Sequence, residues 1–88
     1  MTPDTQDDAT GGENIRLRAV LMARLRQMMR DRRLTQVQAA RWFHVSQSRV
    51  SHLVNDQRNR FTVDTLANML ASAGVHVSVT FENAQGRA

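Results

Sequence analysis

The chain has 88 residues, 41% of them hydrophobic, with a formal net charge of +4 and no cysteine. This length supports one domain with one compact core, and the lack of cysteine excludes disulfides and thiolate metal sites. There is no apolar run of the roughly 18 residues that span a bilayer and no secretory signal pattern, so we expect a cytoplasmic protein without a membrane partner.

Charge is distributed unevenly along the chain. Residues 1–13 carry −4, so residues 14–88 carry +8. All twelve basic residues are arginine, which binds phosphate and guanine through paired hydrogen bonds, although a GC-rich genome would also favour arginine codons. So high a charge on a small domain indicates an anionic partner. We expect residues 1–13 to be a disordered acidic tail that either aids solubility or contacts a partner protein.

The first predicted helix runs from about residue 15 to residue 33, with Asn14 as its N-cap. Its apolar residues recur at three- and four-residue steps and form one face: Ile15, Leu17, Val20, Leu21, Leu25, Met28 and Met29. Arg32 and Arg33 lie in the last turn, where the helix dipole favours cations. The other face carries arginines that we expect to be solvated: Arg16, Arg18, Arg24, Arg26 and Arg30.

Residues 34–55, LTQVQAARWFHVSQSRVSHLVN, predict two short helices joined by a break of three or four residues. The first of them starts at Thr35, which forms a capping box with Gln38. Its inward residues are Ala39, Ala40 and Phe43, and the two alanines permit close approach of another helix. Trp42 lies one step from this stripe and is interpreted as a core residue, with an exposed partner contact as the alternative.

The second of these helices starts at Ser46, which serves as its N-cap. Val45 and Val50 have the spacing of a hydrophobic staple around that cap. The helix is polar on one side and opens with side chains that both donate and accept hydrogen bonds. Two short helices, of which the second is apolar on one side and polar on the other, are typical of a helix-turn-helix, in which the second helix lies in the DNA major groove.

A fourth helix is predicted over residues 63–73, with Thr62 as its N-cap and Gly74 as its C-terminal stop. The apolar pattern then changes to a period of two, so residues 75–82 are predicted to be a strand. A lone strand leaves both edges unpaired. We therefore expect it to pair with the same strand of a second copy, through Val75, Val77, Val79 and Phe81, and we expect residues 83–88 to be a frayed tail.

These motifs resemble the Xre/Cro family of helix-turn-helix regulators over about residues 15–82. The resemblance is carried by TQVQAA, VSQSRVSHLVN and RFTVDTLANMLASAGVHVSV. It implies a mainly all-α fold of four to five helices, with residues 14–74 as the DNA-binding domain and one C-terminal β-strand that pairs across a dimer. The last stretch is similar to the small antitoxins of HigBA- or RelBE-like modules, which implies an autorepressor that neutralises a ribonuclease toxin.

Two positions depart from the family pattern. His44 stands in the turn where glycine is usual, and a left-handed backbone there costs a histidine roughly 1 kcal/mol. Asn55 and Asp56 follow the second helix of the motif where Asn-Gly is common, and the Asp56 carboxylate is a poor neighbour for phosphate.

The predicted DNA contacts divide into those that position the protein and those that read sequence. The positioning residues lie at the helix starts and after the recognition helix: Gln36, Ser46, Asn55, Arg58 and Arg60, with a solvated loop as the alternative for the two arginines. The first residues of the recognition helix are expected to enter the groove: Gln47, Ser48 and Arg49, with guanine or a phosphate as the target of Arg49. His52 follows, with a base or a phosphate as its target, and Ser51 is the weakest of the set. A dimer would read a pseudo-palindromic operator with half-sites about one helical turn, ~34 Å, apart.

Catalysis is not expected, because the folded part has no cysteine, glycine-rich phosphate loop or carboxylate cluster. His44, His52 and His76 fall in different elements and predict no metal site, and we expect no cofactor or small-molecule ligand. Three functions stay open. The first is an antitoxin that represses its operon and binds a toxin, the second a stand-alone or phage-type repressor, and the third a protein-interaction module that has lost DNA binding.

Overall fold

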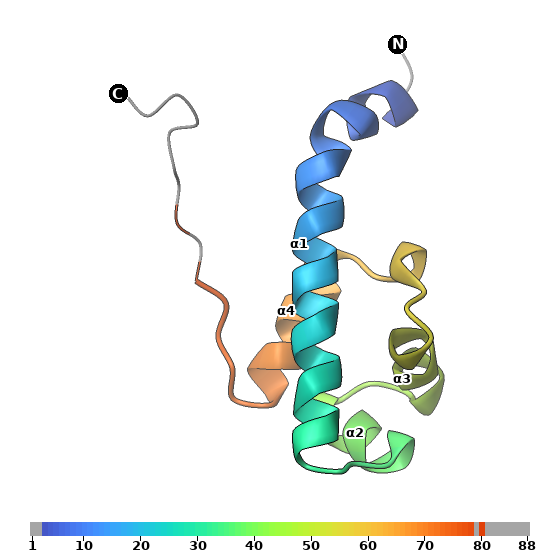
Figure 1. Ribbon diagram of the computed structural model, residues 1–88, viewed down its shortest axis with the longest axis vertical. Coiled ribbons are helices and arrows are strands. Elements are labelled where there is room, and N and C mark those ends of the chain that lie inside the picture. The colour runs from blue at the N-terminus through green and yellow to red at the C-terminus, as the bar shows by residue number, and fades with distance from the viewer. Residues whose placement is uncertain (1–2, 79, 81–88) are drawn as a thin grey trace.

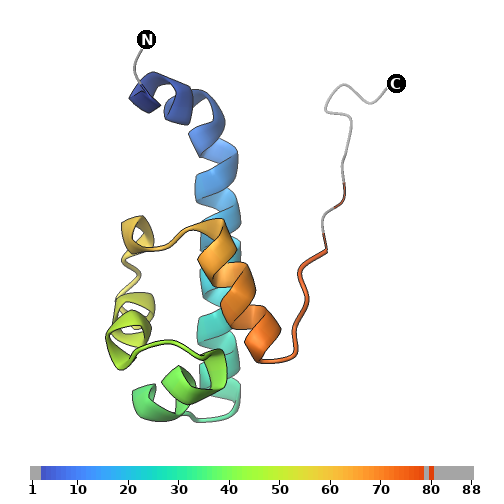
Figure 2. The same cartoon turned by 180° about the vertical axis from the view of Figure 1, so that it is seen from behind.

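The computed structural model describes residues 3–78 and 80, which contain four α-helices and one short 3-10 helix. The α-helices are α1 (Pro3–Asp31), α2 (Gln36–Phe43), α3 (Gln47–Val54) and α4 (Val63–Ser72), and the 3-10 helix is η1 (Arg58–Arg60). The long α1 forms the axis of the molecule, and the shorter helices gather around its C-terminal half (Figures 1 and 2). In the described part of the chain, no helix is both long and apolar enough to cross a membrane.

The helix α1 differs from its predicted bounds at both ends. It begins at Pro3 rather than near residue 15, so Asn14 lies inside the helix and is not its N-cap. Proline is well suited to the first position of a helix, where its missing N–H has no intrahelical partner to lose. At the other end the helix stops at Asp31, because Arg33 has a left-handed backbone with φ of 53°.

Only the C-terminal half of the predicted apolar face of α1 is buried. The early members are exposed: Ile15, Leu17 and Val20. These three side chains lie on the sides of α1 that the shorter helices leave open, so no described residue buries them. The later members are buried as expected, together with Met22, which the predicted stripe did not include: Leu21, Met22, Leu25, Met28 and Met29.

The core lies where α1 meets the three shorter α-helices. Its largest fully buried side chains come from all four: Met22, Leu25, Phe43, Val50, Leu53, Leu66, Met69 and Leu70. Each such burial contributes roughly 1.5–3 kcal/mol relative to exposure. Ala39 is completely buried, as its predicted role requires. Trp42 is half-buried against this core, stacked on Phe43 with ring centroids 5.4 Å apart, and the Arg32 guanidinium lies 4.4 Å from its centroid.

All four α-helices end in the same hydrogen-bonded turn, the Schellman motif. After each helix, one residue takes a left-handed backbone. In chain order these residues are Arg33, His44, Asp56 and Gly74. The amide of the next residue donates to a carbonyl five residues back, as Val45 does to Ala40 at 3.0 Å and Val75 to Leu70 at 2.8 Å. Gly74 is the predicted stop of α4, and the left-handed conformation expected of His44 is confirmed, with φ of 58° and ψ of 48°.

The predicted C-terminal strand is not formed in the described residues of the single chain. Residues 75–78 and 80 have no regular structure, and the segment runs away from the helices (Figures 1 and 2). A strand exists only when its amides and carbonyls have a partner strand, and the helical body offers none. The Val75 amide instead closes the end of α4, while Val77 is exposed. Val79 and Phe81 lie outside the described residues.

The left-handed residues at the helix C-termini predict how substitutions there change stability. Replacing His44→Gly should raise the free energy of unfolding by about 1 kcal/mol, because glycine adopts this backbone without steric cost. Thermal unfolding should show a rise in Tm of roughly 4–8 °C. Gly74→Ala is the matched control and should shift stability in the opposite direction, since φ there is 87° and an added Cβ would meet no atom within 4 Å. Equal or reversed shifts in the two variants would contradict this explanation.

Candidate nucleic-acid interface

Two side-chain caps fix where α2 and α3 begin. At α2, the Thr35 hydroxyl accepts from the Gln38 amide at 3.1 Å and the Gln38 side chain accepts from the Thr35 amide at 2.9 Å, which confirms the predicted capping box. At α3, the Ser46 hydroxyl accepts from the Arg49 amide at 3.1 Å. Because both caps sit at the surface, the first turn of each helix points its free amides towards solvent, where an anion could bind.

The turn between α2 and α3 spans residues 44–46. Val50 and Leu53 of α3 face the core and are completely buried. This leaves the first polar residues of α3, Gln47 and Ser48, exposed. Two short helices packed on each other, with the second presenting its N-terminal polar face, make the geometry of a helix-turn-helix.

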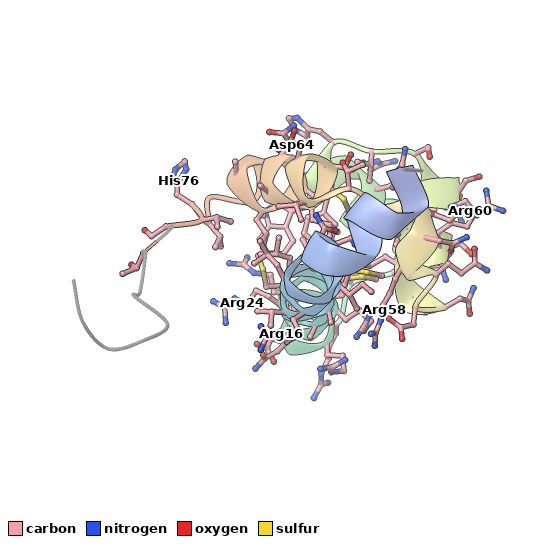
Figure 3. The ribbon with its side chains drawn as sticks, turned by 90° about the horizontal axis from the view of Figure 1, so that it is seen from above. Arg16, Arg24, Arg58, Arg60, Asp64 and His76 are labelled. Carbon is pink, nitrogen blue, oxygen red and sulfur yellow. The ribbon has the colours of Figure 1, made fainter. Side chains whose placement is uncertain are left out.

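The structure brings six polar residues together around an open hollow of about 420 Å³: Ser46, Ser48, Arg49, His52, Asn59 and Arg60. Five of them were predicted as site residues, and they come from the start of α3 and from η1. Arg60 projects outward on this side of the molecule, whereas His76 lies on the opposite side (Figure 3). Hydroxyl, imidazole, amide and guanidinium groups in one concave surface suit an anionic ligand with acceptor oxygens.

Asn59 was not among the predicted site residues, although its place between two arginines in the loop after the recognition helix was a usable signal. The other predicted residues do not line the hollow. Gln36 lies at the start of α2, and Gln47 is on the exposed first turn of α3. Asn55 closes α3 and donates to the Ser51 hydroxyl at 3.4 Å, so these two lie together at the far end of the helix.

Arg49 makes contacts that its sequence position did not reveal. Its guanidinium donates to the Arg60 carbonyl oxygen at 2.7 Å and lies 5.4 Å from the ring centroid of Phe61. Phe61 is buried, with 2% of its surface exposed. The side chain expected to contact a base or a phosphate is therefore engaged with the loop that follows α3.

Asp56 is the acceptor of a small charge cluster at the end of α3. Its carboxylate accepts two bonds from Arg58, both 3.2 Å, and one from Arg26 of α1, also 3.2 Å. The hydrogen bonds from Arg58, with the positive charges of Arg58 and Arg26, hold the pKa of Asp56 below its ordinary 3.8. The negative charge that made this position a poor neighbour for phosphate is thus compensated within the protein, and Arg58 is occupied.

Two arginines of α1 are not the solvated residues that the sequence predicted. Arg18 donates to the carbonyl oxygens of Arg58 at 3.3 Å and Phe61 at 3.4 Å, and its buried Nε has no hydrogen-bond partner. Arg26 donates to the Leu53 carbonyl at 3.4 Å as well as to Asp56. With Arg49, these residues form what we call the arginine clasp: Arg18, Arg26 and Arg49, bonded to main-chain carbonyls between residues 53 and 61.

Within the described residues, no group of three or more histidine, cysteine, aspartate or glutamate side chains could hold a metal ion. Figure 3 places His76 well away from the loop that carries Arg58 and Arg60. The groups gathered around the hollow hydrogen-bond and carry positive charge, which are the properties of a nucleic-acid contact surface.

Comparison with known proteins agrees with this geometry. A family model described as a helix-turn-helix domain matches residues 5–82. The chain therefore belongs to the helix-turn-helix domain family, of the Xre-like DNA-binding type. The comparison with curated proteins gives no match. The predicted resemblance to Xre-type regulators is thus confirmed at the level of the family, together with the mainly helical fold.

The charge cluster at Asp56 predicts a pH-dependent stability. Because the folded-state pKa is depressed, ionised Asp56 stabilises the fold above its unfolded pKa, and this contribution is lost as pH falls through the folded pKa. The stability difference between the wild type and Asp56→Asn should stay constant from neutral pH to about pH 5 and then shift against the wild type. Urea unfolding across this range measures it. An identical pH dependence of the two proteins would contradict the role of the cluster.

Proposed function

We propose that this protein is a sequence-specific DNA-binding transcriptional repressor. The observation that carries the proposal is the hollow where the capped start of α3 meets Arg60 of η1. In a helix-turn-helix, the first residues of the second helix enter the major groove while neighbouring segments contact the backbone. The groups around this hollow can therefore contact base edges and phosphate oxygens at the same time.

The contacts divide by what each side chain can reach. Gln47 and Ser48 are exposed on the first turn of α3 and read base edges, where a glutamine pairs with adenine through two hydrogen bonds. His52, one turn further along, contacts a base or a phosphate. The backbone contacts come from Gln36 and Ser46 at the helix starts, from Asn55, and from Arg60. Arg58 contributes less than its charge suggests, since Asp56 already holds it.

We also propose that two copies bind one operator. Val75 packs against the core, but residues 76–78 are exposed, and among them Val77 lies between the polar His76 and Ser78. An antiparallel pairing of two such segments would satisfy their backbone groups and produce the two-fold axis that a pseudo-palindrome requires. In this arrangement Val77 lies on one face of the ribbon, beside apolar residues of the partner chain, and His76 and Ser78 lie on the other face.

Fluorescence anisotropy on DNA from upstream of the protein's own gene tests the function. Binding should be tighter than to a scrambled duplex, and it should weaken steeply with salt because each phosphate contact releases counterions. A stoichiometric titration should give two chains per duplex. Gln47→Ala should reduce the preference for the operator by the equivalent of about 1–3 kcal/mol, the value of one bidentate base contact.

The controls separate the parts of this proposal. Equal, weak affinity for both duplexes would contradict sequence-specific binding by this surface and favour a protein-interaction module. One chain per duplex would contradict the dimer alone. Val77→Asp should separate the two chains in sedimentation experiments, whereas His76→Asp, on the opposite side of the proposed strand, should not.

The narrower proposal is that the repressor is an antitoxin with a ribonuclease toxin as its protein partner. Its support is the sequence resemblance of residues 60–79 to such antitoxins and the exposed apolar side chains of α1, among which Val20 is 63% exposed. Val20 shares a helix face with Arg16 and Arg24, four residues to either side. Both arginines point away from Arg60 (Figure 3), so a toxin on this face would leave the DNA surface free.

Co-expression with the product of the adjacent gene tests the antitoxin proposal. The chain should restore growth that this product arrests, and the two should purify together. Val20→Asp should weaken the complex because it places a charge in an apolar contact, while DNA binding stays intact. Deletion of residues 1–13 removes the acidic residues, which include the first turns of α1, and keeps Ile15 and Val20, so it shows which of the two regions the toxin needs. A neighbouring gene product that is harmless, or that the chain does not bind, would leave a stand-alone repressor.

A further inference from the structure

The loop between α3 and α4 owes its shape to side chains from other elements. The helix η1 has three residues, and the side chain of its N-cap residue Gln57 does not cap it. All three residues, Arg58, Asn59 and Arg60, are exposed. Phe61, which follows them, is the first buried residue after α3. Burial therefore anchors one end of the loop, and hydrogen bonds to its carbonyl oxygens must fix the rest.

Arg49 supplies the bond nearest to the proposed DNA surface. Its backbone amide is held by the Ser46 cap at 3.1 Å, so the root of the side chain is fixed in the first turn of α3. Its tip donates to the Arg60 carbonyl at 2.7 Å and lies over the Phe61 ring. A bond from a charged donor is roughly twice as strong as one between neutral groups. Arg49 thus connects the first turn of α3 to the backbone of Arg60, and so helps to fix where the Arg60 side chain begins.

The planar guanidinium explains how one side chain makes both contacts. Its edge carries N–H donors and its face stacks on an aromatic ring, which a lysine ammonium cannot reproduce. Five N–H donors are present, so donors remain for a ligand in the hollow that Arg49 also lines. A residue held in this way cannot extend freely towards a base edge without breaking the 2.7 Å bond.

We propose that Arg49 is a positioning residue: it holds η1 against the start of α3, so that Asn59 and Arg60 meet the DNA in a fixed register with Gln47 and Ser48. This inference rests on the proposed function and changes the role that the sequence suggested for Arg49. Its contribution to affinity then passes through Arg60, because a preorganised loop avoids the ordering cost that binding would otherwise include.

The first test uses the full-length protein without DNA. Hydrogen exchange of the backbone amides in residues 58–61 should accelerate in Arg49→Ala and in Arg49→Lys, while exchange in the core helices stays as in the wild type. The amides of Arg60 and Phe61 donate to Gln57 and Arg58, so their protection reports the loop directly. Arg24→Ala is the control: it removes one exposed arginine of α1, on the other side of the molecule from Arg60 (Figure 3). Unchanged exchange in the Arg49 variants would overturn the proposal.

The second test is a double-mutant cycle on the operator duplex. Arg49→Ala alone should weaken binding about tenfold or more, as expected for a lost hydrogen bond to a charged group. In an Arg60→Ala background the same change should cost much less, and Arg49→Ala should leave the order of preference among operator variants unchanged. Additive losses would make Arg49 an independent DNA contact, and lost discrimination at one base pair would make it a base reader; either result overturns the proposal. If the wild type binds no duplex, the proposed function fails, and the exchange experiment still decides the role of Arg49.

Discussion

Burial of apolar side chains against the C-terminal half of α1 is the interaction on which the rest of this fold depends. The helices α2 and α3 have eight residues each and α4 has ten, and isolated helices of that length are not stable in water. Each gains stability by placing two or three side chains in the common core. Once Val50 and Leu53 occupy that core, the rotation of α3 about its axis is fixed, and its polar residues are directed outward.

The elements that sequence predicted well are those governed by local chemistry. Thr35, Ser46 and Thr62 cap their helices as their residue types require, and each accepts the expected backbone hydrogen bond. Gly74 ends α4, and His44 takes the left-handed backbone that the turn demands. Periodicity identified the buried face of the C-terminal half of α1. These features depend on residues within one or two turns of each other, so a single sequence contains enough information to predict them.

The features that sequence did not predict depend on contacts between distant residues. Arg18 and Arg26 looked like solvated members of a helix face, yet they bond to carbonyls about 30 to 40 positions further along the chain. Arg49 was expected to contact a base or a phosphate, and its sequence position did not reveal the bond it makes to the loop after α3. The apolar pattern of α1 could not show which of its sides the shorter helices leave open. The alternating valines predicted a strand, but a strand also needs a partner, which the described single chain does not supply.

The bonds of the arginine clasp stabilise the loop after α3 and respond to salt differently from the attraction between the protein and DNA. Its bonds join a charged group to neutral carbonyl oxygens, and they are short-range, so dissolved ions screen them far less than they screen attraction to a distant phosphate. Arg18, Arg26 and Arg49 also count towards the formal charge, although each already donates to a main-chain carbonyl. Raising the ionic strength should therefore leave the contact surface in place while its long-range attraction declines. The net charge of the sequence consequently overstates the number of phosphates that this surface can neutralise.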